Sequence, residues 1–438
     1  MKKAALHNLG CKVNSYETEA MQQLLEEAGY EIVPFSEMAD VYVINTCSVT
    51  NMADRKSRQM LHKAKKQNPD SVVVATGCYV QIKEKEVLED LAIDIVLGNN
   101  KKHELVGAIE GFIQSRSNNS DIIDINDGKQ EFEELFLTQT AEHTRAFIKV
   151  QDGCNQFCSY CIIPYARGRV RSRKLENVIA EVERLAANGF KEVVLTGIHL
   201  SSYGVDCEDN LLHLIQEVHK VEGILRIRLG SLEPKIVTEE FARELSKLDK
   251  ICPHFHLSLQ SGCDETLKRM NRKYNTQEYE KGCNILRKYF EHPAITTDVI
   301  VGFPGETDEE FAMTKEFLER IHFYEMHIFK YSKRQGTRAA VMENQVPEEV
   351  KTERSAKLIE LGEQMSKEFR DYYIGKEQEV LFEEENEILG EKYYTGYTKE
   401  YLKTAIKSNE KLDNCFVKGV IDSALTNDVY LLRKCDFS

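Results

Sequence analysis

Short apolar runs that alternate with amphipathic helical patterns constrain the fold of this chain more than any other feature of its sequence. Near the start, apolar runs at residues 3–9, 41–45 and 71–75 are each followed by a helical pattern, at residues 17–28, 51–66 and 82–91. Strands that alternate with helices form parallel sheets, because each helix carries the chain back to the same edge of the sheet. We therefore expect residues 1–115 to form a three-layer α/β domain with a parallel sheet.

The alternation restarts at residue 146 and continues for six units. Strands are predicted at residues 146–150, 192–196, 224–229, 254–259, 295–301 and 325–330, and helices between them at 177–188, 210–221, 239–247, 277–290 and 309–321. A closed barrel of this kind has eight units, so six units predict an open (β/α)6 partial barrel. With a charged connecting helix at residues 351–370, this domain is expected to span residues 141–370.

Two stretches have a different character. Residues 116–140 are polar and then acidic, and they are predicted to form a linker. Beyond residue 370, short strands with turns are predicted at residues 379–383, 392–397, 401–408, 415–422 and 428–433. They favour a small C-terminal β-barrel over residues 371–438, similar in kind to barrels that bind oligonucleotides. The predicted fold class is therefore α/β with a β-barrel appended.

Charge and composition narrow the classes of protein. The chain has 438 residues and a formal net charge of −14, which disfavours nucleic-acid binding over its whole surface. It has no apolar run of the roughly 20 residues that a membrane helix needs, and its start does not resemble a signal peptide. We expect a cytoplasmic protein without a membrane partner. In that setting its twelve cysteines indicate metal binding or catalysis rather than disulfides.

Three of these cysteines lie within eight residues, in the pattern C-x3-C-x2-C at Cys154, Cys158 and Cys161. They follow the first predicted barrel strand, at the face where such barrels place their chemistry. A structural zinc site has four ligands, and no fourth Cys or His lies nearby at zinc-finger spacing. An iron–sulfur cluster held by three thiolates leaves one iron open for a ligand, which is the starting point of radical chemistry with S-adenosylmethionine (SAM).

Three further cysteines occupy equivalent positions in the first domain. Cys11, Cys47 and Cys78 each follow one of its three predicted strands. Ligands of parallel sheets lie beyond the carboxyl ends of the strands, so the three thiols are expected to converge on one site. The alternative is that they are three separate buried cysteines of the core.

With these two groups in view, the chain resembles the methylthiotransferases among the radical-SAM enzymes. The resemblance rests on Cys154–Cys161 with the segment at residues 162–169, on the three cysteine motifs of the first domain, and on a C-terminal barrel like the family's RNA-binding TRAM domain. It implies two [4Fe–4S] clusters, one on Cys154, Cys158 and Cys161 and a second on Cys11, Cys47 and Cys78. The first would cleave SAM to a 5′-deoxyadenosyl radical, and the second would carry the sulfur that reaches the substrate carbon.

The resemblance also assigns side chains to SAM and to RNA. By their position after barrel strands, the SAM pocket is expected to include Gly197, Ser231, Glu233, Gln260 and Gly302, although tight turns that cap the next helix would explain the same residues. Phosphate contacts are expected from two basic runs, at Arg55, Arg58 and Lys63 and at Arg167, Arg169, Arg171 and Arg173. A solvated helix face is the alternative for either run. The C-terminal barrel segment has a net charge of 9 − 14 = −5, so an RNA contact there would need a local patch.

Within the family, residues 9–14 and 195–204 are most similar to the branch that acts on N6-threonylcarbamoyladenosine. The expected reaction is methylthiolation of C2 of this base, next to the anticodon of tRNA. The expected partners are the tRNA anticodon stem-loop and a reduced electron donor of flavodoxin or ferredoxin type; the oligomeric state stays open. Alternatives are isopentenyladenosine in tRNA, an aspartyl residue of a ribosomal protein, or, in another class, an RNA-binding or electron-transfer iron–sulfur protein.

Overall fold

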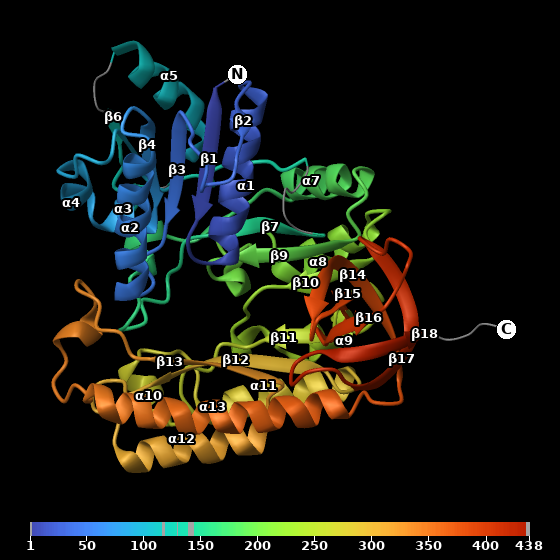
Figure 1. Cartoon of the computed structure of the whole chain (residues 1–438). Helices are drawn as coiled ribbons and strands as arrows, with labels where there is room; N and C mark the ends of the chain where they lie inside the picture. Colours follow the sequence, from blue (N-terminus) through green and yellow to red (C-terminus); the bar gives the residue numbers. More distant parts are fainter. Residues whose placement is uncertain (1, 116–118, 129, 139–143, 435–438) are drawn as a thin grey trace.

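The computed structural model describes residues 2–115, 119–128, 130–138 and 144–434. Figure 1 shows the N-terminal sheet in blue, the strands of the partial barrel beneath it, the long helix α13 (Glu348–Asp371) along the lower side, and the C-terminal β-barrel in red. Within the described ranges, none of the helices has both the length and the apolar surface that crossing a bilayer requires.

The N-terminal sheet is parallel throughout, with strand order β2-β1-β3-β4-β5-β6. Its strands are β1 (Lys3–Asn8), β2 (Glu31–Ile32), β3 (Val41–Thr46), β4 (Val72–Gly77), β5 (Ile95–Leu97) and β6 (Asn119–Asp121). Helices α1 (Lys12–Glu27) and α5 (Leu105–Ser115) cover one face, and α2 (Asn51–Gln67) covers the other. Each face has its own apolar cluster, which accounts for the continuous apolar runs of the central strands.

Two predictions in this domain were wrong. The helix expected at 82–91 is instead two short helices, α3 (Cys78–Ile82) and α4 (Glu84–Leu88), because Lys83 leaves the helical conformation while Val80 and Val87 pack into the same cluster. Strand β6 lies in the expected linker and pairs with β5, so the sheet extends beyond residue 115. The expected boundary at residue 140 lies outside the described residues.

The partial barrel has its six strands where the alternation predicts them. They are β7 (Arg145–Asp152), β9 (Glu192–Gly197), β10 (Arg226–Leu229), β11 (His254–His256), β12 (Ala294–Val301) and β13 (Glu325–Lys330). Strands β10-β9-β7 form one parallel group and β11-β12-β13 another, and parallel bridges such as Leu232 to Leu257 join the two groups. The short strand β8 (Arg171–Ser172) pairs with β7 in the antiparallel sense, so β7 and β13 are not paired and the barrel is open, which confirms the predicted fold class.

Helices cover the outside of this barrel. They are α7 (Leu175–Ala187), α8 (Leu211–Lys220), α9 (Glu239–Leu245), α10 (Asp264–Arg269), α11 (Thr276–Tyr289) and α12 (Asp308–Ile321), followed by α13, whereas the short α6 (Ile163–Arg167) packs against α3 of the N-terminal domain. One large apolar core joins them to alternate strand residues, such as Ile148, Leu195 and Val299. Because successive strand residues point to opposite faces, the remaining residues of each strand line the inside of the barrel.

The C-terminal barrel is closed, with strand order β14-β15-β16-β18-β17. Its strands are β14 (Glu377–Ile388), β15 (Glu391–Tyr397), β16 (Lys403–Ile406), β17 (Cys415–Ala424) and β18 (Tyr430–Lys434). It packs on the end of the partial barrel where the strands begin. There Arg226 of β10 donates to the carbonyl of Tyr397 at 2.8 Å, and Arg228 donates to that of Lys399 at 2.9 Å.

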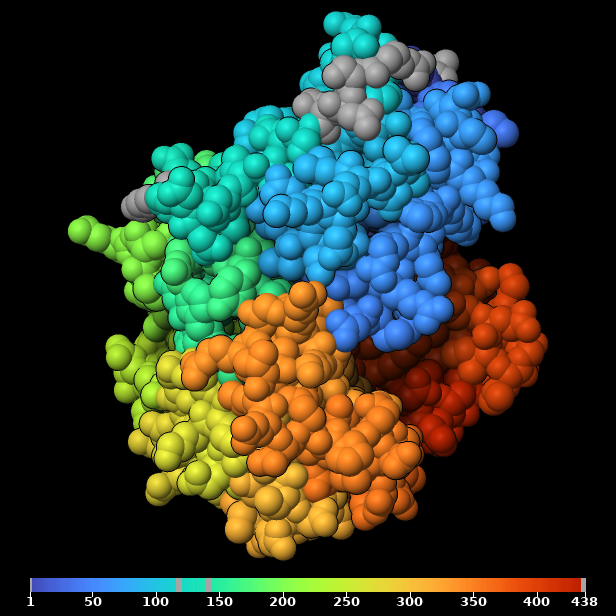
Figure 2. Space-filling view, turned by 90° about the vertical axis from the view of Figure 1, so that its left-hand side faces the viewer, coloured from blue at the N-terminus to red at the C-terminus, as the bar shows by residue number. Residues whose placement is uncertain are grey.

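The N-terminal domain contacts both edges of the open side of the partial barrel. On the β7 edge, Lys149 bonds Glu17 of α1 at 2.7 Å. Beyond β13, Arg334 bonds Asp54 of α2 at 2.7 Å. Figure 2 shows the surface hollowed where the blue N-terminal domain, the orange segment around α13 and the red C-terminal barrel meet. The inside of the barrel is therefore bounded by all three parts of the chain.

Candidate active site

The thiols of Cys11, Cys47 and Cys78 converge at the carboxyl ends of three adjacent strands, β1, β3 and β4. The turn at Gly10 has a φ of +114°, and a Cβ there would lie 2.9 Å from the Cys47 sulfur. Gly77, with a φ of +96°, turns the chain so that Cys78 begins a helix directly. The strand exits are therefore shaped to bring the three side chains together.

The electrostatics of these thiols suit a metal cluster. Burial, together with the neighbouring thiols of Cys78 and Cys11, raises the pKa of Cys47 to about 11. Burial among the surrounding residues also raises the pKa of Cys11, although the residue itself is accessible to solvent. Clustered thiols of this kind ionise on binding a cation, since the metal supplies the charge that the buried site lacks.

Two side chains donate hydrogen bonds to the sulfur of Cys78. The Nε of Arg167 lies 3.3 Å from it, and the amide nitrogen of Asn99 lies 3.8 Å from it. Both donors are fully buried. Donors fixed on a ligating sulfur orient the ligand and tune the metal, so these contacts fit a cluster ligand better than an isolated core cysteine.

The second triplet lies in the loop after β7. Cys154 and Cys158 are buried, Cys161 is partly buried, and the Cys161 N–H bonds the Cys158 carbonyl at 2.9 Å. Burial raises the pKa of Cys154 to about 11 and that of Cys161 to about 12, and neighbouring thiols add to both shifts. Gly153 makes the loop possible, because a Cβ there would lie 1.8 Å from the Arg169 carbonyl oxygen.

An arginine also reaches this second triplet. Arg272 donates from Nη1 to the Cys158 sulfur at 3.3 Å and pairs with Glu233 at 3.1 Å. The Gln156 amide donates a hydrogen bond to the Glu233 carboxylate at 3.3 Å, and the Nε2 of His199 lies 3.3 Å from the same carboxylate. Sequence reasoning missed Arg272, since it lies more than a hundred residues from the cysteines in the chain.

The residues expected in the SAM pocket differ in their position and exposure. Glu233 and Gln260 lie at the carboxyl ends of the barrel strands, and Gln260 has a φ of +73° that turns its chain at this edge. Ser231 is exposed beside them. Gly197 makes room for the side chain of Gln151, 2.8 Å from where a Cβ would stand.

Gly302 faces the protein itself on one side. A Cβ at this position would lie 2.3 Å from the Cγ of Lys351 in α13. The glycine therefore makes room for this helix, as Gly197 does for Gln151, and a contact between its backbone and SAM stays a prediction.

Three arginines expected to contact RNA are instead buried at the interface between the N-terminal domain and the barrel. Arg167 pairs with Glu17 and lies near Asp152, Arg171 also lies near Asp152, and Arg173 pairs with Glu181 and Glu134. Their exposed fractions are 0%, 3% and 0%, so a phosphate cannot reach them. The prediction of RNA contact is corrected for these three, because burial requires a charge to be paired and neighbouring carboxylates already pair them.

The remaining basic residues are exposed. Arg55, Arg58 and Lys63 lie on one outer face of α2, which forms a shallow groove with Gln59, His62 and Lys66. Arg169 is exposed and lies 4.6 Å above the Phe157 ring in the second cysteine loop. These four residues stay candidates for RNA contact.

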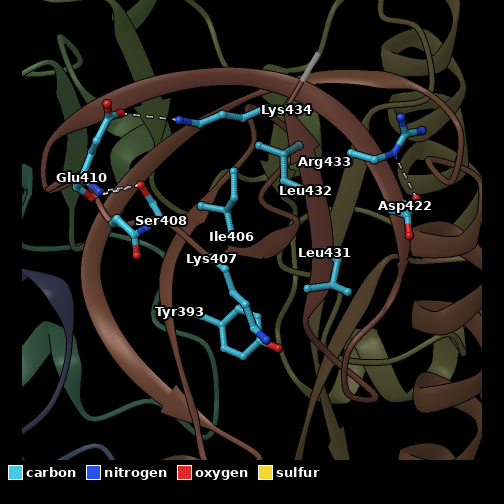
Figure 3. A pocket seen from close by; sticks show the side chains of 11 residues that line it. Tyr393, Ile406, Lys407, Ser408, Glu410, Asp422, Leu431, Leu432, Arg433 and Lys434 are labelled. Carbon is cyan, nitrogen blue, oxygen red and sulfur yellow. Dashed lines mark hydrogen bonds and ion pairs between the residues drawn. The ribbon is translucent and has the colours of Figure 1, made fainter. Parts of the chain in front are cut away.

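The C-terminal barrel offers a groove of its own, which Figure 3 shows from close by. Its cations are paired: Lys407 with Glu391 at 2.7 Å, Lys434 with Glu410 at 3.7 Å and Arg433 with Asp422 at 3.3 Å. Surface pairs of this kind are weak, so a phosphate can compete for the cations.

Comparisons with known proteins agree with this site. Residues 148–318 match the radical SAM superfamily, and residues 3–98 match an uncharacterized protein family, UPF0004. The chain is 45% identical to a threonylcarbamoyladenosine tRNA methylthiotransferase of Bacillus subtilis, covering 95% of this chain and 93% of that protein. It is 37% identical to a tRNA-2-methylthio-N(6)-dimethylallyladenosine synthase of Acetivibrio thermocellus, over 90% of this chain and 83% of that one.

The solved structures agree on the fold. The radical S-adenosylmethionine methyltransferase TsrM of Kitasatospora setae superimposes with a TM-score of 0.58 over 78% of this chain and 77% of that one, at 15% identity. This likeness concerns the fold alone, whereas the identity to the curated relatives extends over almost the whole chain. The protein belongs to the family of radical SAM tRNA methylthiotransferases, which confirms the resemblance drawn from its cysteine motifs.

Proposed function

We propose that this protein methylthiolates C2 of N6-threonylcarbamoyladenosine next to the anticodon of tRNA, with SAM as co-substrate. The observation that carries the proposal is the pair of convergent cysteine triplets, one on the N-terminal sheet and one on the barrel, in a chain 45% identical to a protein named for this reaction. We propose that the target base is inserted between the two sites, in a space that we call the chamber.

The ligands follow from the thiol groups. Cys154, Cys158 and Cys161 hold one [4Fe–4S] cluster, and Cys11, Cys47 and Cys78 hold the second. When bound, the first cluster supplies the electron that splits SAM into methionine and a 5′-deoxyadenosyl radical, and the second supplies the sulfur for the substrate carbon. With three thiolates, each site would leave one iron for a further ligand, SAM at the first cluster and sulfur at the second.

The protein's own side chains hold this arrangement in place. Arg167 and Arg272 each donate to one thiol of a triplet, at Cys78 and Cys158. A fixed cation beside a thiolate stabilises its charged form and raises the reduction potential of the group that it ligates. Glu233, which Arg272 orients, lies at the barrel edge where a hydroxyl or ammonium group of SAM can be bound, together with Ser231, Gln260 and Gly197.

RNA and electrons are expected to arrive from outside this chamber. Arg55, Arg58 and Lys63 on α2 and Arg169 near the second triplet form the phosphate contacts to an anticodon stem-loop. The electron donor is a reduced protein of flavodoxin or ferredoxin type, and with tRNA as substrate the protein acts in the cytoplasm. The chain comprises an N-terminal domain that extends past residue 115 to include β6, a partial barrel that ends at residue 370, and a C-terminal barrel at residues 371–438.

Nucleoside mass spectrometry of tRNA tests the proposal. In cells that lack the gene, we expect threonylcarbamoyladenosine without its methylthio group, and we expect the group to return when the protein is supplied. A change in isopentenyladenosine instead would assign the protein to the other tRNA branch. Anaerobic incubation with SAM and a reductant should form 5′-deoxyadenosine, and its absence would contradict the enzymatic role.

A further inference from the structure

The inside of the partial barrel is lined by charged and polar side chains. On β7, Ala146, Ile148 and Val150 pack into the outer apolar core, so the alternate residues 145, 147, 149 and 151 face inward. The same alternation on β9, β10, β11 and β12 places a further set of charged and polar side chains on the inner face. They are Glu192, Thr196, Arg226, Arg228, His254, His256, Thr296 and Asp298. This lining extends from the amino ends of the strands, where the C-terminal barrel packs, toward the carboxyl ends, where the cysteines lie.

Most cations of this lining are already neutralised. Lys149 lies 2.7 Å from Glu17, Arg145 lies 2.6 Å from Glu383, and Arg228 lies 2.8 Å from Glu192. Each of these charges is held by a carboxylate of the protein. These cations contribute to the electrostatic potential inside the chamber, but their ion pairs hold the parts of the chain together.

Lys12 is different. It is the first residue of α1, directly after Cys11, and its Nζ lies 6.0 Å from the centre of the inward-facing Phe147 ring. Burial and the charges of Arg145 and Arg228 disfavour its ammonium form, whereas the charge of Glu192 favours it. Glu192 is bound to Arg228 at 2.8 Å, and no carboxylate of the described residues lies within ion-pair distance of the Lys12 ammonium group. An anion that binds beside Lys12 would therefore supply the direct partner that this cation lacks.

The neighbouring His254 reports the same positive field. Burial, together with Arg228 and Lys12, lowers the pKa of His254 well below its usual value, so this ring is neutral. Its Nδ1 is buried and has no hydrogen-bond partner among the described residues. The chamber thus holds one uncommitted cation and one uncommitted polar ring atom in a region of positive potential.

We propose that Lys12 binds the carboxylate of the threonyl group of the substrate and thereby selects threonylcarbamoyladenosine over adenosines with a hydrocarbon substituent. This inference rests on the function proposed above. A threonylcarbamoyl group ends in a carboxylate, whereas an isopentenyl or dimethylallyl group carries no charge. Because the substituent is attached at N6 and C2 lies on the same edge of adenine, anchoring it beside Cys11 presents C2 to the front triplet.

The test compares two anticodon stem-loop RNAs that differ by a single charge. One carries threonylcarbamoyladenosine, and the other carries the same group with the carboxylate replaced by a neutral carboxamide. We expect the wild-type protein to prefer the carboxylate by roughly 10- to 100-fold in kcat/KM, the range for loss of a charge-assisted hydrogen bond. In Lys12→Met the preference should fall to within about threefold, and Lys12→Arg should restore most of it.

Controls separate this role from others. Iron and sulfide content is measured for each variant because Lys12 adjoins Cys11, and Lys281→Met on the exposed face of α11 serves as the matched loss of a lysine. Equal losses on both RNAs in Lys12→Met would mean a phosphate or structural contact and would overturn the inference. A rise in KM for SAM alone would also overturn it. A wild-type protein that modifies neither RNA would refute the proposed function itself, which is a distinguishable result.

Discussion

Replacing Arg167 with Met is expected to destabilise the interface between the N-terminal domain and the barrel by about 3 kcal/mol. The Arg167 guanidinium is fully buried and bonds both oxygens of Glu17, at 2.5 and 3.0 Å, and the Asn14 side chain at 2.6 Å. Removing one member of a buried ion pair typically costs about 3–5 kcal/mol, because the other charge is left uncompensated. Lys149 and Lys102 remain within ion-pair distance of Glu17, at 2.7 and 3.4 Å. Because they still compensate part of its charge, we expect the lower end of that range.

Hydrogen exchange of α1, read by mass spectrometry, measures this loss locally. A global unfolding curve is unsuitable because a chain of several domains need not unfold in one step. A loss of about 3 kcal/mol corresponds to a fall of roughly 100-fold in protection wherever exchange requires the interface to open. Arg269→Met is the matched control, since its pair with Glu310 is partly exposed and worth about 1 kcal/mol or less.

The same variant has a second readout at the metal site. Arg167 donates to the Cys78 sulfur, so its loss should lower the reduction potential of the front cluster in a spectroscopic titration, whereas the barrel cluster should be unchanged. The double variant with Glu17→Gln should recover part of the stability, because it removes the orphaned charge, but should not recover the potential. Unaltered protection in α1 together with an unaltered potential would refute the assigned role of Arg167.

Three further predictions follow from particular contacts. Cys47→Ala should abolish methylthio transfer yet keep reductive cleavage of SAM, whereas Cys158→Ala should abolish both; equal losses in 5′-deoxyadenosine and nucleoside assays would contradict the division between the triplets. Replacing Arg55, Arg58 and Lys63 together with Gln should weaken tRNA binding. It should also reduce the slope of the logarithm of the binding constant against the logarithm of the salt concentration by about 2–3. Replacing the exposed pair Lys281 and Lys288 with Gln serves as the control. The hydrogen bond to Glu133 raises the pKa of His103, so its stabilisation is complete below about pH 6.5 and is lost as pH rises through the folded-state pKa. His103→Gln should therefore show a smaller loss of hydrogen-exchange protection in the adjoining helix α5 between pH 6 and pH 8, and an unchanged loss would refute the assignment.

The convergence of Cys11, Cys47 and Cys78 could be predicted because it follows from local patterns. Each cysteine ends a short apolar run, and parallel strands bring their carboxyl ends to one edge whatever the details of packing. The six strands of the partial barrel were predictable for the same reason, since their periodicity lies within a few residues of each element. Chemistry placed at strand ends is the part of a site that such patterns reveal.

The buried arginines could not be predicted in this way. Arg167 and its partner Glu17 are 150 residues apart in the chain, and they meet because two domains pack together. A run of arginines at alternate positions has the same local sequence whether it faces solvent, RNA or a buried carboxylate. Arg272 and Lys351 were missed for the same reason, since each acts on a residue that only the tertiary fold brings near.

These buried cations also bear on how an acidic protein can bind RNA. The net charge of −14 includes the cations of Arg167, Arg173, Arg228 and Lys149, which are buried inside the molecule and cannot contact RNA. Their partners Glu17, Glu181 and Glu192 are buried too and cancel these charges inside, so the net acidity of the chain lies on its outer surface and repels a polyanion at long range. An approaching tRNA must be held by a small exposed set, for which the outer face of α2 is the best candidate. Affinity would then come from a few phosphate contacts, which makes binding weak in high salt, and the choice of base would fall to the chamber between the two triplets.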